Sequence, residues 1–390
     1  MVEICGKILQ KVRNNKLLVT NFSYLSILQV FTLISPLITY PYLIRTIGLE
    51  LNGVVVFGQS ISTYMALIIN FGFNISGVRQ IAINKADKNR LNEIISVIYT
   101  NKFIIWLMLL MGWLVLIGHI SFFQEHYWVY FWSFFITINE LLFPVWLFQG
   151  LEKMKYTTLI NISVRLLFIV LVFFVVKKQA DYYRVSFLYA FGAFIAGAIS
   201  TWMVFSYLRY RYKRPTFLSM KRAVLEGFPL FISSISIQIY ANINKLLVGG
   251  FLGMSEVSIY DFSEKIIAVA RIPMGIIQQT IFPKISRERN VAFVNKMLKY
   301  VSVLNIVICV MVLLLMPLVM DYMLGKVYEE GMLVTLIMAC SLIVSGVNLF
   351  LGGCRLIPWG YSKVYSKTAV LNSLFFILLA ALMYVLGYIS

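Results

Sequence analysis

The 390-residue chain is too apolar to be a soluble globular protein. Apolar residues make up 60% of it and charged residues only 13%, whereas the surface of a soluble domain needs about 25% charged residues. The composition therefore predicts an integral membrane protein. The formal net charge of +18 indicates basic segments in contact with anionic membrane lipids, and nucleic acid is not an expected partner.

Eleven apolar runs along the chain have the length of a membrane-spanning helix. About 20 residues of helix cross a hydrocarbon core of about 30 Å, and runs of this length exclude a barrel of short alternating strands. We therefore predict an all-α polytopic membrane protein. The predicted spans cover residues 17–44, 54–76, 103–120, 128–148, 156–176, 185–207, 227–251, 259–282, 301–320, 332–352 and 368–388.

The basic residues predict the orientation of these spans. With a cytoplasmic N-terminus, 25 of the 34 Lys and Arg residues, Lys102 among them, fall on the cytoplasmic side, against five outside. This bias follows the positive-inside rule. The first run is too long for a cleavable signal and has no small-residue cleavage site after it, so we expect it to remain as the first span. The four cysteines lack a CxxC pattern or a nearby His, so no disulfide, metal site or cofactor is expected.

The chain repeats when it is shifted by 205 residues. Segment 47–57 then falls on 252–262, and Val78-Arg79 falls on Pro283-Lys284. We predict a six-helix bundle over 1–208, a basic cytoplasmic linker over 209–226 and a second bundle over 227–390. An even number of helices per half makes the repeat parallel, about an axis along the membrane normal. The second bundle shows five spans, because the shift places Ser390 opposite Val185, and its last helix is expected to be missing.

Several charged residues fall inside the predicted spans. A charge at the centre of a span costs about 2.5–3.5 kcal/mol on insertion scales, so it normally faces protein or water. The rise per residue puts Glu140 and Arg271 about 18 Å from the outer ends of their helices, near the midplane. Lysines closer to the surface have the alternative of snorkelling. The other charged residues of this kind are Arg165, Lys245, Asp261, Glu264 and Lys265.

Polar and small residues form stripes on three predicted spans. At 100° per residue, positions 261, 264, 265, 268, 271, 275 and 279 of the eighth span fall within about 120°. The matching positions of the second span hold Gln59, Thr63, Ala66, Asn70 and Asn74. The seventh span carries Ser234, Gln238, Ala241 and Lys245 on one face, and Tyr240 and Asn244 on another. These stripes indicate a shared cavity, although Ser, Asn and Gln also hold packed membrane helices together.

Prolines are expected to kink several spans, because each removes a backbone donor. A bend of this kind is one way to alternate which end of a cavity is open. The prolines concerned are Pro36, Pro41, Pro144, Pro229 and Pro273.

Three stretches of the sequence carry a family resemblance. The first runs from Pro36 to Gly48 and on to Phe71-Gly72-Phe73-Asn74 and Val78-Arg79; the second is Trp146 to Met154; the third runs from Leu246 to Gly253 and on to Phe282-Pro283-Lys284-Ile285-Ser286. Together they resemble the Wzx-type flippases, the polysaccharide transporter branch of the multidrug/oligosaccharidyl-lipid/polysaccharide exporter superfamily. The missing last helix departs from the family pattern.

The resemblance implies two six-helix bundles in a V around a central cavity. It also implies a bacterial inner-membrane flippase that moves an undecaprenyl-diphosphate-linked oligosaccharide to the outer leaflet for O-antigen and other surface polysaccharide. The implied mechanism is alternating access, with a proton or sodium counter-ion and the polysaccharide polymerase machinery as expected partners.

Such a substrate needs cations deep in a hydrated cavity. Arg271 is the first candidate for the diphosphate, because a guanidinium binds phosphate oxygens through forked hydrogen bonds and stays charged when desolvated. Lys245, Lys265 and Arg45 are expected near the exit and Arg79 near the entrance. The candidates for sugar hydroxyls are Gln59, Asn70, Gln238, Tyr240 and Asn244.

Three carboxylates are candidates for ion coupling on the return stroke. Glu140, Asp261 and Glu264 lie at depth, where desolvation favours binding a proton or sodium. The alternative for Glu264 is a simple ion pair with Lys265 or Arg271.

Two other functions are alternatives to a flippase. A multidrug exporter of the same superfamily would usually carry acidic rather than basic cavity residues, and the mixed set here leaves it as the alternative. A membrane glycosyltransferase or polymerase would place catalytic acids or long loops outside, but the outer loops predicted here are short. The chain is therefore expected to be a transporter and not an enzyme.

Overall fold

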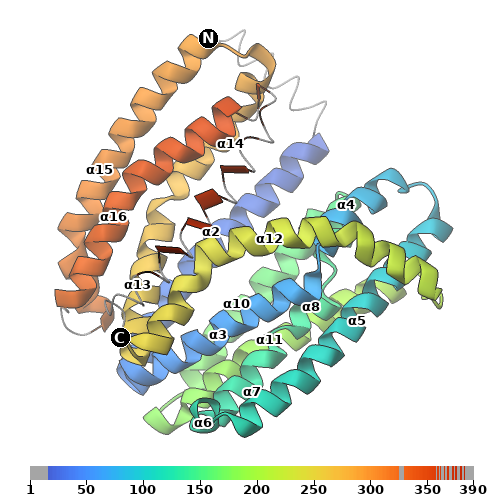
Figure 1. Cartoon of the computed structure of the whole chain (residues 1–390), viewed down its shortest axis with the longest axis horizontal. Helices are drawn as coiled ribbons and strands as arrows, with labels where there is room; N and C mark the ends of the chain where they lie inside the picture. Colours follow the sequence, from blue (N-terminus) through green and yellow to red (C-terminus); the bar gives the residue numbers. More distant parts are fainter. Residues whose placement is uncertain are drawn as a thin grey trace. The chain divides into compact units, whose positions relative to one another are not determined.

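The computed structural model describes residues 16–324, 329–356 and scattered positions between 358 and 382. The described residues form helices and the segments that connect them (Figure 1). The chain divides into two compact units. Unit 1 comprises Met1–Ser35, Gly58–Lys177 and Asp181–Ile235, and unit 2 comprises Pro36–Phe57, Lys178–Ala180 and Ser236–Ser390. The bundle and linker boundaries expected from the sequence remain predictions.

Three helices contribute residues to both units. They are α2 (Lys16–Ile47), α3 (Leu49–Asn70) and α12 (Phe217–Phe251). Unit 1 also contains α4 (Phe73–Ile83), α5 (Lys88–His119), α6 (Ser121–Gln124), α7 (Tyr127–Phe135), α8 (Ile138–Leu142), α9 (Val145–Gly150), α10 (Met154–Val175), α11 (Tyr182–Trp202) and the π-helical turn η2 (Met203–Tyr207). Unit 2 also contains α13 (Met254–Ala270), α14 (Ile272–Glu288), α15 (Val291–Leu324), α16 (Glu329–Phe350) and the π-helical turn η3 (Leu351–Leu356), and the short 3₁₀ helix η1 (Gln179–Asp181) lies at its boundary with unit 1.

Eight segments within the described residues are long and apolar enough to cross a membrane. They are Ser23–Ile47, Leu49–Asn70, Lys88–His119, Tyr127–Gly150, Met154–Val175, Gln179–Tyr207, Val291–Leu324 and Gly331–Asn348. The expected seventh span is helical, as α12, and the expected eighth span forms the pair α13 and α14. Their polar residues lower their hydropathy, and these helices are not among the eight apolar segments. The expected eleventh span, 368–388, lies largely outside the described residues.

The second predicted span is broken at Phe71 and Gly72, which separate α3 from α4. Both residues have positive φ, 45° and 79°. Gly72 is required there because a Cβ would lie 2.5 Å from the carbonyl oxygen of Gly227 on α12, and a Cβ on Gly227 would lie 2.5 Å from the Phe71 oxygen. The Phe71 ring stacks on Phe231 with the centroids 4.7 Å apart. The break is thus fixed by backbone contact with α12.

The fourth predicted span is also broken, into α7, α8 and α9. Pro144 follows α8 and cannot donate a backbone hydrogen bond. Hydroxyl groups satisfy the last carbonyl of α8. The carbonyl of Leu142 accepts hydrogen bonds from Tyr99 Oη at 3.2 Å, Ser200 Oγ at 3.3 Å and Thr201 Oγ1 at 3.0 Å. In a membrane, irregular backbone persists only where protein groups satisfy it in this way.

Within unit 2, the first turns of α3 and α13 pack backbone against backbone. Asn52 Nδ2 donates to Ser258 Oγ at 2.8 Å, and Ser258 Oγ donates to the Leu49 carbonyl at 2.7 Å. The phenol of Tyr40 donates to the Ser258 carbonyl at 2.7 Å. Gly53 permits this approach, because a Cβ there would overlap the carbonyl oxygen of Met254.

The helix starts reflect the internal repeat of the sequence. α3 begins at Leu49 and α13 at Met254, which differ by the same 205 residues as the sequence shift. A glycine with positive φ precedes each helix, Gly48 at 85° and Gly253 at 129°. These matches support the repeat at this point of the chain, while the number of helices in each half stays a prediction.

We predict that Gly53→Ala destabilises the protein. Overpacking of a closed contact typically costs about 1–3 kcal/mol, and the neighbouring atoms are backbone that cannot rotate away. The measurement is thermal unfolding of the purified protein in detergent.

Gly112→Ala is the matched control, because Gly112 also lies within a helix but has open space around it. Removing this glycine should be neutral or slightly stabilising, since Ala is favoured over Gly in helices by about 1 kcal/mol. Equal melting temperatures for the two variants would contradict the packing argument.

Candidate transport site

In unit 2, α12 and α13 are joined by four charged side chains, Lys245, Asp261, Glu264 and Lys265, which we call the tetrad. Lys245 Nζ lies 2.7 Å from Asp261 Oδ1 and 2.5 Å from Glu264 Oε2. Lys265 Nζ contacts the other carboxylate oxygen, Asp261 Oδ2, and lies 4.4 Å from the ring centroid of Tyr40. Two ammonium groups therefore balance two carboxylates.

Asp261 is the centre of the tetrad. It contacts both lysines, and its side chain is 4% exposed, whereas that of Glu264 is 34% exposed. A buried carboxylate is tolerated only when its oxygens are paired, and here each oxygen of Asp261 has its own lysine. The sequence predicted these four residues as separate ligands for substrate or ions; within unit 2 they bind one another. Glu264 pairs with Lys245, whereas the sequence pointed to Lys265 or Arg271.

Arg271 lies outside the tetrad, at the junction between α13 and α14. The predicted eighth span is one helix in the sequence, but α13 ends at Ala270 and α14 begins at Ile272. Pro273, in the first turn of α14, cannot donate to the carbonyl four residues earlier, and proline is favoured at a helix start. The Arg271 side chain is exposed and forms no salt bridge with any described residue.

The remaining predicted residues of unit 2 have local partners or lack a described side chain. Asn244 Nδ2 donates to Tyr260 Oη at 2.8 Å. The exposed guanidinium of Arg45 donates to the carbonyl of Tyr322 and lies 5.8 Å from its ring centroid. Gln238 is half-buried. Tyr240 lies in α12, and its side chain is outside the description.

Unit 1 contains a second buried ion pair, Lys102 with Glu140. Lys102 Nζ lies 2.7 Å from Glu140 Oε1, 3.2 Å from the Glu140 carbonyl and 3.3 Å from Asn74 Oδ1. Asn74 Nδ2 also donates to Glu140 Oε1 at 3.0 Å. Pro144 lies four residues after Glu140 and leaves its carbonyl without a helical donor. Lys102 thus compensates both the carboxylate and the backbone of Glu140.

Lys102 is a buried, paired residue that the sequence reasoning missed. It was counted with the basic residues of the cytoplasmic side, because the apolar run begins only at Phe103. In the structure, α5 already begins at Lys88, which puts Lys102 about 21 Å along the helix, and its side chain is 1% exposed. The spacing of the sequence could have indicated this burial. Ile98, Lys102 and Trp106 are four residues apart, and all three lie on the buried face of α5.

Three other predicted residues of unit 1 lie on α3 and α4. Asn70 Oδ1 accepts the backbone N–H of Asn74 at 2.8 Å, so Asn70 positions the amide that contacts Glu140. Gln59 is half-buried in α3, and Arg79 is exposed on α4. Of the thirteen predicted site residues, four lie in unit 1 and nine in unit 2. Their convergence on one cavity remains a prediction.

The family of polysaccharide biosynthesis proteins matches residues 18–289 of this chain. The chain belongs to this polysaccharide biosynthesis protein family. A protein of Escherichia coli (strain K12) called "Putative O-antigen transporter" is 27% identical over 367 residues, which cover 92% of this chain and 88% of that protein. A protein of the same description from Shigella dysenteriae is 27% identical over 362 residues, 88% and 87% of the two chains. The resemblance inferred from the sequence is confirmed.

Solved structures of transporters show the same fold. An inward-facing multidrug resistance transporter of the MATE family, in the MOP superfamily, aligns with a TM-score of 0.57 and 15% identity over 89% of this chain and 85% of that chain. A MATE protein in complex with MaL6 aligns with a TM-score of 0.52 and 15% identity over 90% and 85%. With the eight apolar segments, these matches confirm an all-α, multi-pass membrane protein.

We predict that Lys102→Met strongly destabilises the protein. Removing one partner of a buried ion pair typically costs about 3–5 kcal/mol, because the other charge stays buried without compensation. Lys88→Met is the control on the same helix, at an exposed position, and should change the stability little. Thermal unfolding in detergent measures both. A mild effect of Lys102→Met would contradict the buried pairing, and the double variant with Glu140→Gln should recover part of the lost stability.

The two carboxylates of the tetrad should respond differently to neutralisation. Asp261→Asn leaves two lysines with one remaining carboxylate and should cost about 3–5 kcal/mol. Glu264→Gln removes a more exposed partner, and exposed ion pairs are worth about 1 kcal/mol or less. Thermal unfolding of both variants tests this order, and a larger effect of Glu264→Gln would refute Asp261 as the centre.

Proposed function

We propose that the protein is a flippase that moves an undecaprenyl-diphosphate-linked oligosaccharide across the bacterial inner membrane for O-antigen or related surface polysaccharide, by alternating access. Its family and the names of its relatives support this proposal. The bias of basic residues supports a cytoplasmic N-terminus. The polysaccharide polymerase machinery would then take up the product of the flippase at the outer face.

The proposal rests on the exposed side chain of Arg271, which has no salt-bridge partner among the described residues. Lys245 and Lys265 are neutralised by Asp261 and Glu264, whereas Arg271 is exposed at a helix junction and forms no salt bridge with a described residue. A diphosphate offers oxygen pairs that match the fork of a guanidinium. We therefore assign Arg271 as the primary diphosphate ligand, while Arg45 and Arg79 provide charge toward the exit and entrance.

The tetrad suits ion coupling better than direct substrate binding. Protonation of Glu264, its most exposed carboxylate, would release Lys245 from one of its two partners. The tetrad would then have a net charge of about +1, and the ammonium of Lys245 could attract an anion. We place coupling at Glu264 in preference to Asp261, which holds two lysines, and Glu140, where Lys102 already occupies the cation position. A sodium ion at Glu264 would act through the same displacement.

Amide side chains remain as the candidates for sugar hydroxyls. Asn244 uses an amide hydrogen on Tyr260, which leaves its carbonyl oxygen as an acceptor. Gln59, Asn70 and Gln238 belong to the same proposed set, and Tyr240 completes it on sequence grounds.

A multidrug exporter is the second candidate function. The observation in its favour is the fold shared with MATE transporters, one of them described as a multidrug resistance protein. The family match over 18–289 favours the polysaccharide assignment.

We predict that Arg271→Gln abolishes most transport without unfolding the protein. Charge-assisted hydrogen bonds are worth about 1.5–3 kcal/mol, so flipping should slow by roughly ten- to a hundredfold. The measurement is accumulation of the lipid-linked oligosaccharide in the inner leaflet, and loss of surface polysaccharide, in cells whose only copy carries the variant.

Arg289→Gln is the matched control, because it removes the same charge at the exposed end of α14. Arg271→Lys should retain partial activity, since it keeps the charge but loses the fork. Normal polysaccharide export by a well-inserted Arg271→Gln protein would refute the assignment and make drug extrusion the next assay.

A further inference from the structure

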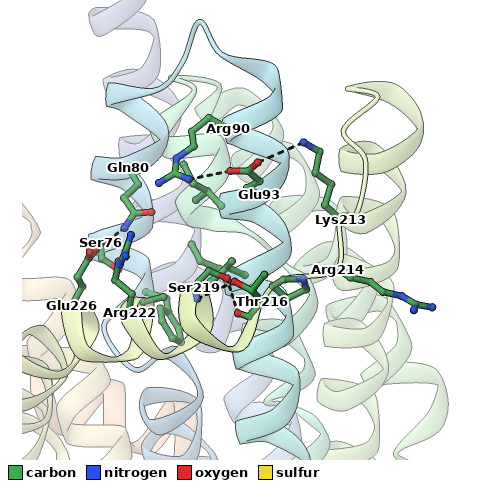
Figure 2. A pocket seen from close by; sticks show the side chains of 16 residues that line it. Ser76, Gln80, Arg90, Glu93, Lys213, Arg214, Thr216, Ser219, Arg222 and Glu226 are labelled. Atoms are coloured by element: carbon green, nitrogen blue, oxygen red, sulfur yellow. Dashed lines mark hydrogen bonds and ion pairs between the residues drawn. The ribbon is translucent and has the colours of Figure 1, made fainter.

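A cavity of about 400 Å³ lies within unit 1, apart from the residues discussed so far. Its walls come from α4, α5, the segment 213–216 and the first turns of α12, as Figure 2 shows. The volume falls in the range of about 300–1,000 Å³ that is typical of small-molecule sites.

The walls of this cavity are predominantly basic. Four cationic side chains line it, Arg90, Lys213, Arg214 and Arg222, against two acidic ones, Glu93 and Glu226. Both carboxylates are already engaged: Glu93 lies 3.0 Å from Arg90 Nη1 and 3.7 Å from Lys213 Nζ, and Glu226 accepts from Gln80 Nε2 at 2.8 Å. The excess charge of the cavity is therefore positive.

Arg222 is one of the two lining cations that have no recognised counter-ion among the described residues, Arg214 being the other. Neither forms a salt bridge with any described residue. Figure 2 shows the Arg222 side chain directed toward Gln80 at the cavity, whereas Arg214 points away. Arg90 also lines the cavity. Its guanidinium has five N–H donors, and Nη1 donates a hydrogen bond to Glu93. The guanidinium groups of Arg90 and Arg222 can therefore both donate hydrogen bonds to a ligand in this cavity.

The N-terminus of α12 forms another wall. The helix begins at Phe217 and runs for 35 residues. Ser219 N donates to Thr216 Oγ1 at 3.3 Å, and Met220 N donates to the Thr216 carbonyl at 3.1 Å. The first N–H groups of a helix have no helical acceptor, and its N-terminus carries about half a positive charge. A helix start beside two guanidinium groups suits an anion.

The opposite face of the same helix turns is apolar. Phe217, Leu218 and Leu225 are 81%, 65% and 63% exposed. At 100° per residue these positions lie away from Thr216, Ser219, Ala223 and Glu226, which line the cavity. In a membrane protein an exposed apolar face next to basic residues lies at the lipid boundary. The cavity is thus within reach of lipid headgroups as well as the aqueous phase.

We propose that this cavity binds a phosphate group, held by Arg222 and Arg90 beside the positive N-terminal end of α12. The ligand is either the headgroup of an anionic lipid or a soluble phosphate compound. Arg271 is not among the residues that line this cavity, and the proposal does not depend on the transported substrate.

The test compares Arg222→Gln with Lys221→Gln in the purified full-length protein. Lys221 is the neighbouring residue, is equally exposed and does not line the cavity, so both variants lose one charge at one place. Titration calorimetry with pyrophosphate in detergent probes a soluble ligand. Native mass spectrometry after reconstitution in nanodiscs of phosphatidylglycerol or phosphatidylcholine probes a headgroup.

We expect Arg222→Gln to weaken binding by about tenfold or more and Lys221→Gln by less than about twofold. Loss in the pyrophosphate titration identifies a soluble phosphate, and loss confined to retained phosphatidylglycerol identifies a lipid. Circular dichroism and the melting temperature establish that both variants are folded, and Arg90→Gln should repeat the loss. Equal weakening by the two variants, or wild-type protein that binds neither probe, overturns the proposal.

Discussion

The absence of water in the bilayer core governs this structure, because every buried polar group must find its partner within the protein. The break after α8 shows the result. Pro144 frees the carbonyl of Glu140, and Lys102 donates to it as well as to the carboxylate. Hydroxyl groups from two other helices donate to the carbonyl of Leu142. The carbonyls of Glu140 and Leu142 therefore both have donors where the helix is interrupted.

The same constraint separates structural charges from functional ones. In the tetrad and in the Lys102–Glu140 pair, each cation contacts a carboxylate, so these cations are already paired within the protein. Arg271 sits at a helix junction with its side chain exposed, and this is the position from which a cation can reach a mobile anion. The proposed roles follow from this difference in partners, not from charge alone.

Sequence periodicity predicted the elements and the polar faces but not the partners across them. The runs of apolar residues predicted the helices, and the stripe on the eighth span contained Asp261, Glu264 and Lys265. That Lys245 bridges Asp261 and Glu264 depends on the rotation of α12 against α13, which no spacing within one helix reveals. The burial of Lys102 was not predicted, because hydropathy alone set the start of its span. The kink expected at Pro273 coincides with the one-residue break at Arg271 between α13 and α14, and Arg271 keeps right-handed helical dihedrals.

The neutrality of the two buried clusters has an electrical consequence. A membrane potential does work on any net charge that moves through it, about 2.3 kcal/mol per elementary charge per 100 mV. Lys102 with Glu140, and the tetrad as a whole, each carry formal charges that sum to zero. These two clusters can therefore shift along the membrane normal with almost no work of their own against the voltage. An unpaired lysine in either cluster would make such a movement depend on the membrane potential.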